Sequence, residues 1–230
     1  DITVNLDQSG TATITPADVD GGSFDNCTAA ADLMYAISQN TFTFADAGTT
    51  IHVDLTVTDS NGNSNTCTAM VTVTVPIPCF NIGTGLGGTN TVVSIPVMVE
   101  NFLNVLSFQF SIELVNSDVG EIIGVSGSNL PGNGLVANLL TSDTMRVSYF
   151  NSQIPVNPVT FADGETIFFV DILLMGNVGD FSTINIIANS MNLPAEVVQD
   201  FGSGAFSTAP CTAPGAVAVN QPAMLDIAGE

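Results

Sequence analysis

Oxygen-bearing side chains are concentrated in two short stretches of the sequence. One stretch holds Asp18, Asp20, Ser23 and Asp25, and the other holds Asp59, Asn61, Asn63 and Asn65. Calcium takes six to eight oxygen ligands of these types, so each stretch could hold the ion, and calcium is the one cofactor that the sequence indicates. The second stretch is similar to an EF-hand loop but lacks the later bidentate glutamate. The alternative is turn chemistry, because Asp and Asn side chains bond to their own backbone.

Residues for catalysis are sparse. His52 is the only histidine, and it alternates with apolar residues on a strand expected at 51–58, so we expect it to face solvent. No Ser/His/Asp set, phosphate-binding loop or GxSxG motif can be assembled. Paired carboxylates could serve a glycosidase, but there is no tryptophan to stack on a sugar, and Tyr35 and Tyr149 are the only tyrosines. We therefore expect no enzymatic activity.

Most of the fourteen phenylalanines fall on alternating strand positions, which predicts core packing. Phe102, Phe161 and Phe201 differ because they lie near expected turns. These three could be surface anchors for a protein partner. The alternative is that each closes the end of a sandwich.

Positive charge is almost absent. Arg146 is the only Lys or Arg, against 22 Asp and Glu, and the net charge is −21. Binding to nucleic acid is excluded, because its affinity comes from cations that neutralise phosphates. Hydrophobic residues make up 45% of the chain, yet none of its apolar runs approaches the ~20 residues of a membrane helix. This composition fits either two apolar cores or outer faces covered by neighbouring molecules.

The apolar residues come in short bursts rich in Val, Ile, Thr and Phe, separated by turn residues, which predicts an all-β protein. Residues 1–76 predict a small Greek-key sandwich of immunoglobulin type, with a hairpin turn at 59–63 between strands 51–58 and 67–75. Residues 77–78 belong to a proline linker that should act as a stiff spacer.

Residues 79–212 predict a larger sandwich of jelly-roll type. Only 134–140 has a spacing that also fits a helix. Residues 213–230 are expected to connect to a following module, and the chain is read as a piece of a longer polypeptide. The strands are expected at 91–99, 105–115, 119–126, 144–150, 166–175, 183–189 and 203–207.

Four cysteines allow three pairings. Cys27 and Cys67 both fall in the first domain, each beside an Asn-rich turn, and Cys79 and Cys211 bracket the second. This placement favours the disulfides Cys27–Cys67 and Cys79–Cys211 and an oxidising compartment. Four reduced thiols in a cytosolic protein are the alternative.

The first domain resembles the HYR-like and PKD-like repeats of Bacteroidetes surface and secreted proteins. The resemblance rests on TATITPADVD at 11–20, DNC at 25–27, FADAG at 44–48, LTVTDSNGN at 55–63 and CTA at 67–69. A cysteine that these repeats often carry before the AG turn is absent here, which leaves Cys27–Cys67 as the local pairing.

The second domain resembles the cohesin-like family, through VSIPV at 93–97, NF at 101–102, SFQFSI at 107–112 and DGETIF at 163–168. The resemblance implies a nine-stranded jelly roll, and the best-known members of the family bind dockerins. Their dockerin-contact surface is not a short motif, so dockerin binding does not transfer from these residues.

Taken together, the sequence predicts an extracellular or cell-surface structural segment, with tandem sandwiches that self-associate into a multi-chain adhesive filament. The alternative is a monomeric stalk whose cohesin-like domain binds a protein, such as a dockerin-like partner, or a glycan.

Overall fold

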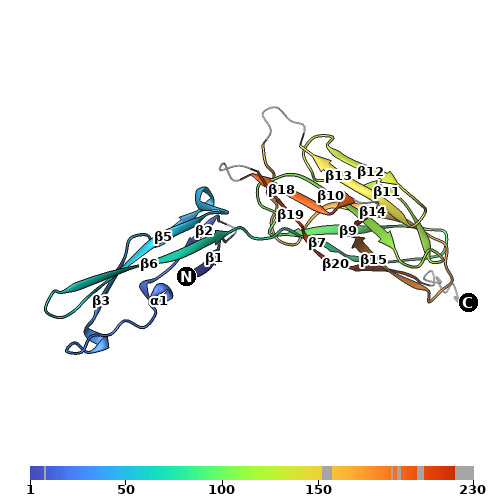
Figure 1. Ribbon diagram of the computed structural model, residues 1–230. Coiled ribbons are helices and arrows are strands. Elements are labelled where there is room, and N and C mark those ends of the chain that lie inside the picture. Colours follow the sequence, from blue (N-terminus) through green and yellow to red (C-terminus); the bar gives the residue numbers. More distant parts are fainter. Residues whose placement is uncertain (8, 152–156, 188, 191–192, 201–204, 221–230) are drawn as a thin grey trace, which may run out of the picture. The chain divides into compact units, whose positions relative to one another are not determined.

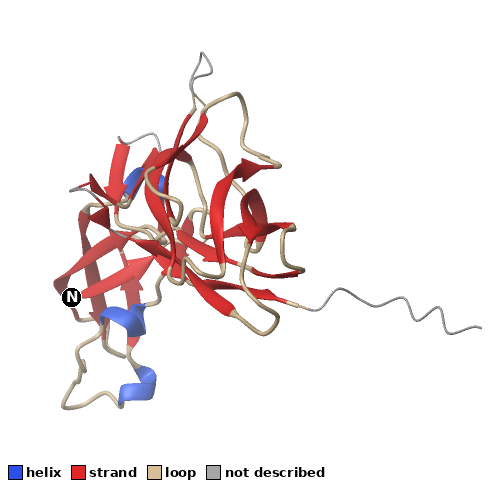
Figure 2. Cartoon of the chain, turned by 90° about the vertical axis from the view of Figure 1, so that its right-hand side faces the viewer, coloured by secondary structure: helices blue, strands red, loops and turns tan. Residues whose placement is uncertain are grey.

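The computed structural model describes residues 1–7, 9–151, 157–187, 189–190, 193–200 and 205–220. The chain forms two compact units, an N-terminal unit of Asp1–Pro76 and a C-terminal unit that begins at Ile77. Both consist mainly of strands, and the three short helical turns of the described residues all lie in the N-terminal unit (Figures 1 and 2). The prediction of an all-β protein is confirmed.

The N-terminal unit contains a four-stranded sheet in the order β1-β6-β5-β3 and a two-stranded sheet of β2 and β4. β1 runs parallel to β6, and the other pairs are antiparallel. The strands are β1 (Ile2–Asn5), β2 (Thr11–Thr13), β3 (Met34–Ile37), β4 (Thr41–Thr43), β5 (Thr50–Thr58) and β6 (Ser64–Thr74), and the helical turns are α1 (Pro16–Val19), η1 (Ala30–Asp32) and η2 (Phe44–Asp46).

The β5–β6 hairpin follows the alternation of its sequence. Val53 and Leu55 on β5 and Val71 and Val73 on β6 are buried, whereas His52 is exposed as expected. The chain reverses after Asp59, where Gly62 takes a φ of +89°. Glycine adopts this conformation without the steric cost of a Cβ, so the hairpin turn forms at the predicted position.

The C-terminal unit contains an eight-stranded sheet and a five-stranded sheet. The first has the order β12-β13-β10-β15-β21-β8, with β18 also paired to β10 and β19 to β18, and the second has the order β11-β14-β9-β7-β20. The eight-stranded sheet is built from β8 (Thr84–Gly87), β10 (Val105–Leu114), β12 (Leu135–Leu139), β13 (Thr144–Phe150), β15 (Phe181–Ile187), β18 (Glu196–Asp200), β19 (Ala205–Thr208) and β21 (Gly215–Val219).

The five-stranded sheet is built from β7 (Cys79–Ile82), β9 (Val92–Glu100), β11 (Gly120–Ser126), β14 (Glu165–Leu174) and β20 (Cys211–Ala213), and a separate short pair is β16 (Asn189–Ser190) with β17 (Leu193–Pro194). Residues 134–140 contain strand β12, so the helical alternative for this segment is wrong. β12 lies at the edge of the eight-stranded sheet, where its backbone forms hydrogen bonds with β13.

An aromatic cluster fills one region of the core. The Phe80 ring lies 4.7 Å from Phe110 and 5.7 Å from Phe102, measured between ring centroids. Phe108 stacks on both Phe110 and Tyr149. Rings at these separations add to the hydrophobic gain of burial. Both sheets contribute to one core, with Phe80 from β7, Phe108 and Phe110 from β10, Tyr149 from β13, and Phe102 from the loop between β9 and β10.

The first two strands of this unit run side by side with, and parallel to, its last two. β7 pairs with β20 in one sheet, and β8 pairs with β21 in the other. Gly83 lies where the first strand passes between sheets, and a Cβ on Gly215 would lie 2.2 Å from the Gly83 carbonyl oxygen. Only glycine allows so close an approach of two backbones.

The expectation that 213–230 forms a connector is wrong for its first part. β21 lies inside the eight-stranded sheet between β15 and β8, and Val217 and Val219 are buried. Residues 75–78, which include the predicted linker, have no regular secondary structure.

Candidate functional site

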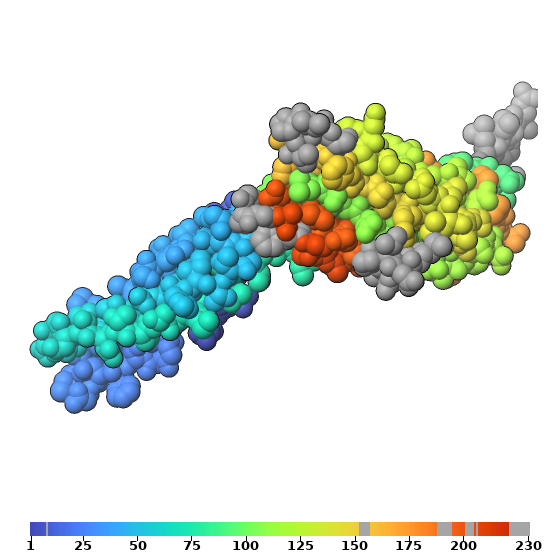
Figure 3. All heavy atoms as spheres, turned by 45° about the horizontal axis from the view of Figure 1, so that its top comes forward, coloured from blue at the N-terminus to red at the C-terminus, as the bar shows by residue number. Residues whose placement is uncertain are grey.

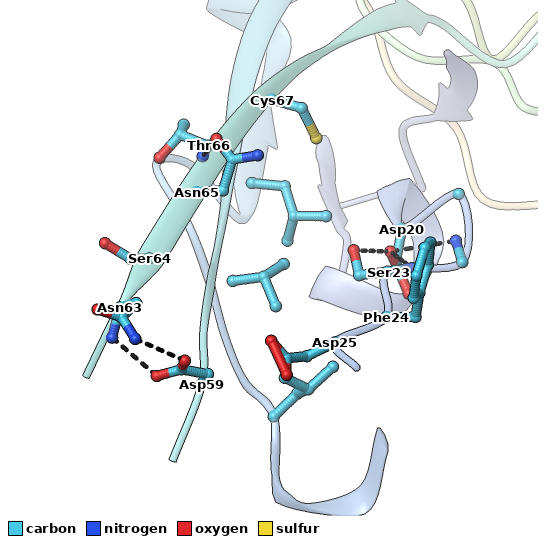
Figure 4. Close-up of a pocket in the computed structure, with 15 residues that line it drawn as sticks. Asp20, Ser23, Phe24, Asp25, Asp59, Asn63, Ser64, Asn65, Thr66 and Cys67 are labelled. Carbon is cyan, nitrogen blue, oxygen red and sulfur yellow. Dashed lines mark hydrogen bonds between the residues drawn. The ribbon is translucent and has the colours of Figure 1, made fainter. Parts of the chain in front are cut away.

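The two acidic stretches lie on opposite sides of a groove in the N-terminal unit, with a volume of about 520 Å³. We call it the acidic groove. Figure 4 shows Asp59 and Asn63 on the hairpin side, facing Asp20 and Ser23 of the loop after α1. Its lining residues are 20–25, Leu33, Leu55, Val57, Asp59 and 63–67.

Asp18 does not line the groove. It caps α1 instead, accepting hydrogen bonds from the Thr15 backbone N at 2.6 Å and the Thr15 hydroxyl at 2.8 Å. Asp20 accepts bonds from the backbone N and the hydroxyl of Ser23. Hydrogen bonds to the charged form stabilise it, so Thr15 lowers the pKa of Asp18 and Ser23 lowers that of Asp20.

Asp25 and Asp59 are held in the same way. Asp25 accepts from the backbone N of Cys27 at 2.7 Å and of Thr28 at 3.0 Å. Asp59 accepts from the Asn63 amide at 2.8 Å and from the backbone N of Asn61, and the Asn63 bond lowers the pKa of Asp59. Asn61 itself lies outside the groove lining.

These contacts correspond to the turn chemistry given as the alternative to calcium. Within the described ranges, no group of three His, Cys, Asp or Glu residues is positioned to share a metal ion. Each carboxylate is instead engaged by donors of its own loop. Calcium therefore stays a prediction for these residues and needs a direct measurement.

The cysteines differ from expectation in one pair. Cys79 and Cys211 form a disulfide as predicted, whereas Cys27 and Cys67 are separate exposed thiols, so the predicted Cys27–Cys67 bond is absent from the structure. Thr28, next to Cys27, bonds to Ser60 in the hairpin turn at 3.1 Å. The pair of β5 and β6 residues next to the hairpin turn is Thr58 with Ser64. Cys67 lies three residues after Ser64, which places it about 10 Å along β6 from the turn. A disulfide needs Cα atoms within about 7 Å.

The prediction of Phe102 as a surface anchor is wrong. Its side chain is fully buried and packs on Phe80 and Phe108. Phe161 is half-buried, with its ring 5.9 Å from that of Phe102, so it covers the same core. Phe201 lies outside the described residues. The alternative, that these rings close the end of a sandwich, holds for Phe102 and Phe161.

The outer face of the eight-stranded sheet is the second candidate surface. Phe108, Phe110 and Ile112 of β10 point into the core, so Ser107, Gln109, Ser111 and Glu113 alternate outward. Ser107, Gln109, Ser148, Glu196 and Val198 line a shallow cavity of about 250 Å³, which we call the sheet hollow. Figure 3 shows the β13 region (yellow) and the β18–β19 region (orange) on the same face of this unit.

Arg146 also lies on this face. Its Cα partners are Ser111 on β10 and Asn138 on β12. The one Lys or Arg of the chain therefore lies among small polar residues, two positions along β13 from Ser148. Gln109 donates to Glu196 at 3.3 Å across the hollow. A surface that carries hydroxyl, amide and carboxylate groups suits recognition of a partner by hydrogen bonds.

Comparison with known proteins supports the fold of the C-terminal unit. The seventh ScaB type I cohesin of Pseudobacteroides cellulosolvens matches 67% of this chain and 99% of its own, at 11% identity and a TM-score of 0.55. The sixth scaffoldin B cohesin of Acetivibrio cellulolyticus, solved with a dockerin, matches 63% and 100%, at 12% identity and a TM-score of 0.53. The OlpA cohesin of Clostridium thermocellum, also solved with a dockerin, matches 63% and 99%, at 14% identity and a TM-score of 0.51.

The C-terminal unit has the cohesin fold. The N-terminal unit holds only a third of the chain, so a match over two thirds falls mainly on the C-terminal unit. No protein-family model and no curated protein matches the chain. The resemblance of the N-terminal unit to HYR-like and PKD-like repeats therefore stays a prediction. In the described part of the chain, none of the helices has the length and apolar character needed to cross a bilayer.

Sequence reasoning missed the sheet hollow and the outward position of Arg146. The signal was present in the alternation of residues 107–113, whose even positions are apolar and odd positions polar. The neighbouring strands that complete the surface come from residues 144–150 and 196–200, and the pairing of these strands with β10 is not encoded locally.

Proposed function

We propose that the C-terminal unit is a protein-recognition module that binds a dockerin-type partner through the outer face of its eight-stranded sheet. The observation that carries this proposal is the likeness to cohesins, several of which were solved in complex with dockerins. A binding role also agrees with the lack of a catalytic set in the sequence. Because identity is below 25%, the likeness supports the fold directly and the partner only through this proposal.

The chemistry of the sheet face supports the proposal. The sheet hollow offers a depression bordered by hydroxyl, amide and carboxylate groups from β10, β13 and β18. Flanking strands in a continuous sheet fix these groups before a partner arrives, which lowers the entropic cost of binding. A partner that presents hydroxyl and amide groups on a helix or strand would find matching donors and acceptors here.

The test uses the full chain immobilised and a panel of purified type I dockerin modules in solution. We expect saturable binding of at least one dockerin, weakened about tenfold or more by Ser148→Arg, which fills the hollow; tenfold corresponds to about 1.4 kcal/mol. Val92→Arg is the matched control, because it adds the same charge at an exposed position on the five-stranded sheet. Equal loss in both variants, or no binding by any module, contradicts the proposal.

Self-association into a filament is the second candidate, and a specific surface favours it. Ile123, Leu139 and Leu140 are exposed and line a hollow of about 330 Å³ where β11 and β12 approach each other at the edges of the two sheets. Exposed apolar side chains that line one hollow are typical of interaction sites. The net charge of −21 opposes association of like copies, so assembly should strengthen with ionic strength.

Sedimentation velocity at low and high salt tests the filament candidate. We expect salt-dependent oligomers that Leu139→Asp abolishes. Leu86→Asp, at another exposed leucine of the same unit, should leave them intact. A monomer at every concentration and salt level argues against the filament.

An extracellular or cell-surface location is part of this proposal, supported by the Cys79–Cys211 disulfide, since disulfides persist in oxidising compartments. Alkylation of material taken directly from its source, followed by mass spectrometry, should find this pair protected. Free thiols at both positions would place the chain in a reducing compartment.

A further inference from the structure

The acidic groove has no role in either function proposed above. It lies between the loop after α1 and the β5–β6 hairpin. Thr28 is buried and accepts the Ser60 backbone N at 3.4 Å, and its hydroxyl lies 3.1 Å from that of Ser60. These bonds tie the loop after α1 to the hairpin turn, across a sequence separation of 32 residues. The loop and the hairpin therefore stand as two walls with a cavity of about 520 Å³ between them.

The floor of the groove is apolar. Leu33 and Leu55 are buried beneath it, at 8% and 1% exposure, and Val57 is half-buried beside them. Phe24 lines the groove from the loop side and is 88% exposed, the largest exposed fraction among the big apolar residues of the described chain. A ring so exposed gains free energy when a partner covers it.

The walls carry negative charge, and residues 1–76 contain no lysine or arginine to oppose it. Asp20, Asp25 and Asp59 line the groove, and hydrogen bonds keep the pKa of Asp20 and Asp59 low, so both are ionised at neutral pH. The chain's one Lys or Arg, Arg146, belongs to the other unit. Carboxylates of one sign around a concave surface raise the local concentration of cations.

A bare metal ion fits this arrangement poorly, because each carboxylate is engaged by its own turn and the two walls stand apart across an apolar floor. A lysine or arginine side chain fits better, since its aliphatic stem can cover apolar surface while the charged end reaches a carboxylate. A cation can also lie over the face of the Phe24 ring.

We propose that the acidic groove is a docking site for a protein segment that carries lysine or arginine next to apolar residues. The charge of the groove complements such a segment. A second copy of this chain is disfavoured as the occupant, because it could offer only Arg146. The proposal is independent of the dockerin-type partner and of the C-terminal unit.

The experiment uses the full chain and a short, capped, fluorescent peptide of alternating lysine and leucine, followed by fluorescence anisotropy. We expect saturable binding of this peptide, no binding of the matching glutamate–leucine peptide, and weaker binding of a lysine–glycine peptide. Phe24→Ala should lower the affinity about fivefold or more. Phe181→Ala is the matched control, since that ring is also exposed but belongs to the other unit, and should leave the affinity unchanged.

Charge is tested in the same way. Asp59→Asn keeps the shape of the side chain and an acceptor for its turn, and should weaken binding, while Asp118→Asn, an exposed carboxylate of the C-terminal unit, should not. Phe24→Ala should remain folded, because its ring is exposed and its removal leaves no cavity in the core. Weaker binding by this variant would then not be due to misfolding. Equal effects of test and control variants would overturn the proposal as a general polyanion effect. Displacement of the peptide by Ca²⁺ at stoichiometric amounts, or dimers of the chain that Phe24→Ala dissolves, would also overturn it.

Discussion

Cys79 and Cys211 are direct Cα partners in the parallel pair of β7 and β20, with their Cα atoms 4.4 Å apart, and a disulfide joins them across a sequence separation of 132 residues. The bond therefore connects the first and last strands of the five-stranded sheet. In the chain-entropy account, closing so long a loop stabilises the folded state by about 5 kcal/mol.

Removal of this bond should destabilise the C-terminal unit. The Cys79→Ser/Cys211→Ser variant should lose up to about 5 kcal/mol of unfolding free energy, because its unfolded chain regains the freedom of the open loop. Urea unfolding followed by Tyr149 fluorescence in a Tyr35→Phe background reports on this unit alone. The Cys27→Ser/Cys67→Ser variant should unfold at the same urea concentration as the parent. An unchanged midpoint without the disulfide would refute the expectation.

A methyl group at Gly215 should be poorly tolerated. The Cβ of Gly215→Ala would lie 2.2 Å from the Gly83 carbonyl oxygen, so β8 and β21 would have to separate. We expect a loss of at least about 2 kcal/mol, measured by urea unfolding. Gly88→Ala provides the comparison, since its Cβ would meet only the Thr91 methyl at 3.8 Å. Similar stability of both variants would contradict the close approach.

Truncation of Phe102 tests whether this residue, which was predicted to be a surface anchor, belongs to the core. Phe102→Ala should cost about 3–5 kcal/mol, because it leaves a cavity beside Phe80 and Phe108. Phe150→Ala, which truncates a ring that is 59% exposed, should change the unfolding free energy by less than about 0.5 kcal/mol. If Phe102→Ala were as mild as Phe150→Ala, the ring would not be part of the core.

Acid should weaken the N-terminal unit. Hydrogen bonds hold the pKa of Asp18, Asp20 and Asp59 below the ordinary value of 3.8. A depressed pKa stabilises the fold at pH values above the unfolded pKa, and the contribution is lost as the pH falls through the folded pKa. We expect Asp59→Asn to lose less stability than the parent when the pH is lowered below about 3.8.

Tyr35 fluorescence in a Tyr149→Phe background follows this unit during urea unfolding at each pH. Asp32→Asn, at an exposed carboxylate of the same unit, should retain the acid sensitivity of the parent. An acid response of Asp59→Asn identical to that of Asp32→Asn would exclude a contribution from the Asp59–Asn63 bond.

Calcium is the remaining prediction from the sequence. If the predicted sites bind the ion, the melting temperature should be higher with Ca²⁺ than with a chelator, whereas an equal melting temperature would mean that the four aspartates 18, 20, 25 and 59 serve only their own turns. Differential scanning calorimetry checks this. A rise with Ca²⁺ that Asp20→Asn and Asp59→Asn remove, and Asp118→Asn does not, would establish a site.

Much of the fold could be predicted because most strands bury one face. The expected strands at 91–99, 105–115, 144–150 and 166–175 agree with β9, β10, β13 and β14 to within one residue at each end, and 144–150 has the same bounds as β13. β8 and β21 were not predicted, because each has only four or five residues, too few to show a period. Their parallel pairing also joins residues more than a hundred positions apart.

The candidate sites were harder to predict than the strands. Asp20 and Asp59 could be recognised as turn residues, but their position on two walls of one groove depends on the contact between Thr28 and Ser60. Phe102 was misplaced because Asn101 takes a φ of +53°, which turns the chain so that Phe102 and Leu103 enter the core. Neither relationship has a periodic signal in the sequence.

The covalent link between β7 and β20 also determines how tension would pass through the molecule. A pull on the chain entering at Pro78 reaches Cys79 and crosses the sulfur bridge to Cys211, so most of residues 80–210 are bypassed. The polypeptide between the two cysteines then cannot be drawn out, so its contour length does not add to the extension of the chain. The strands between the two cysteines, β10, β13 and β18 among them, would thus not be drawn out when the chain is stretched.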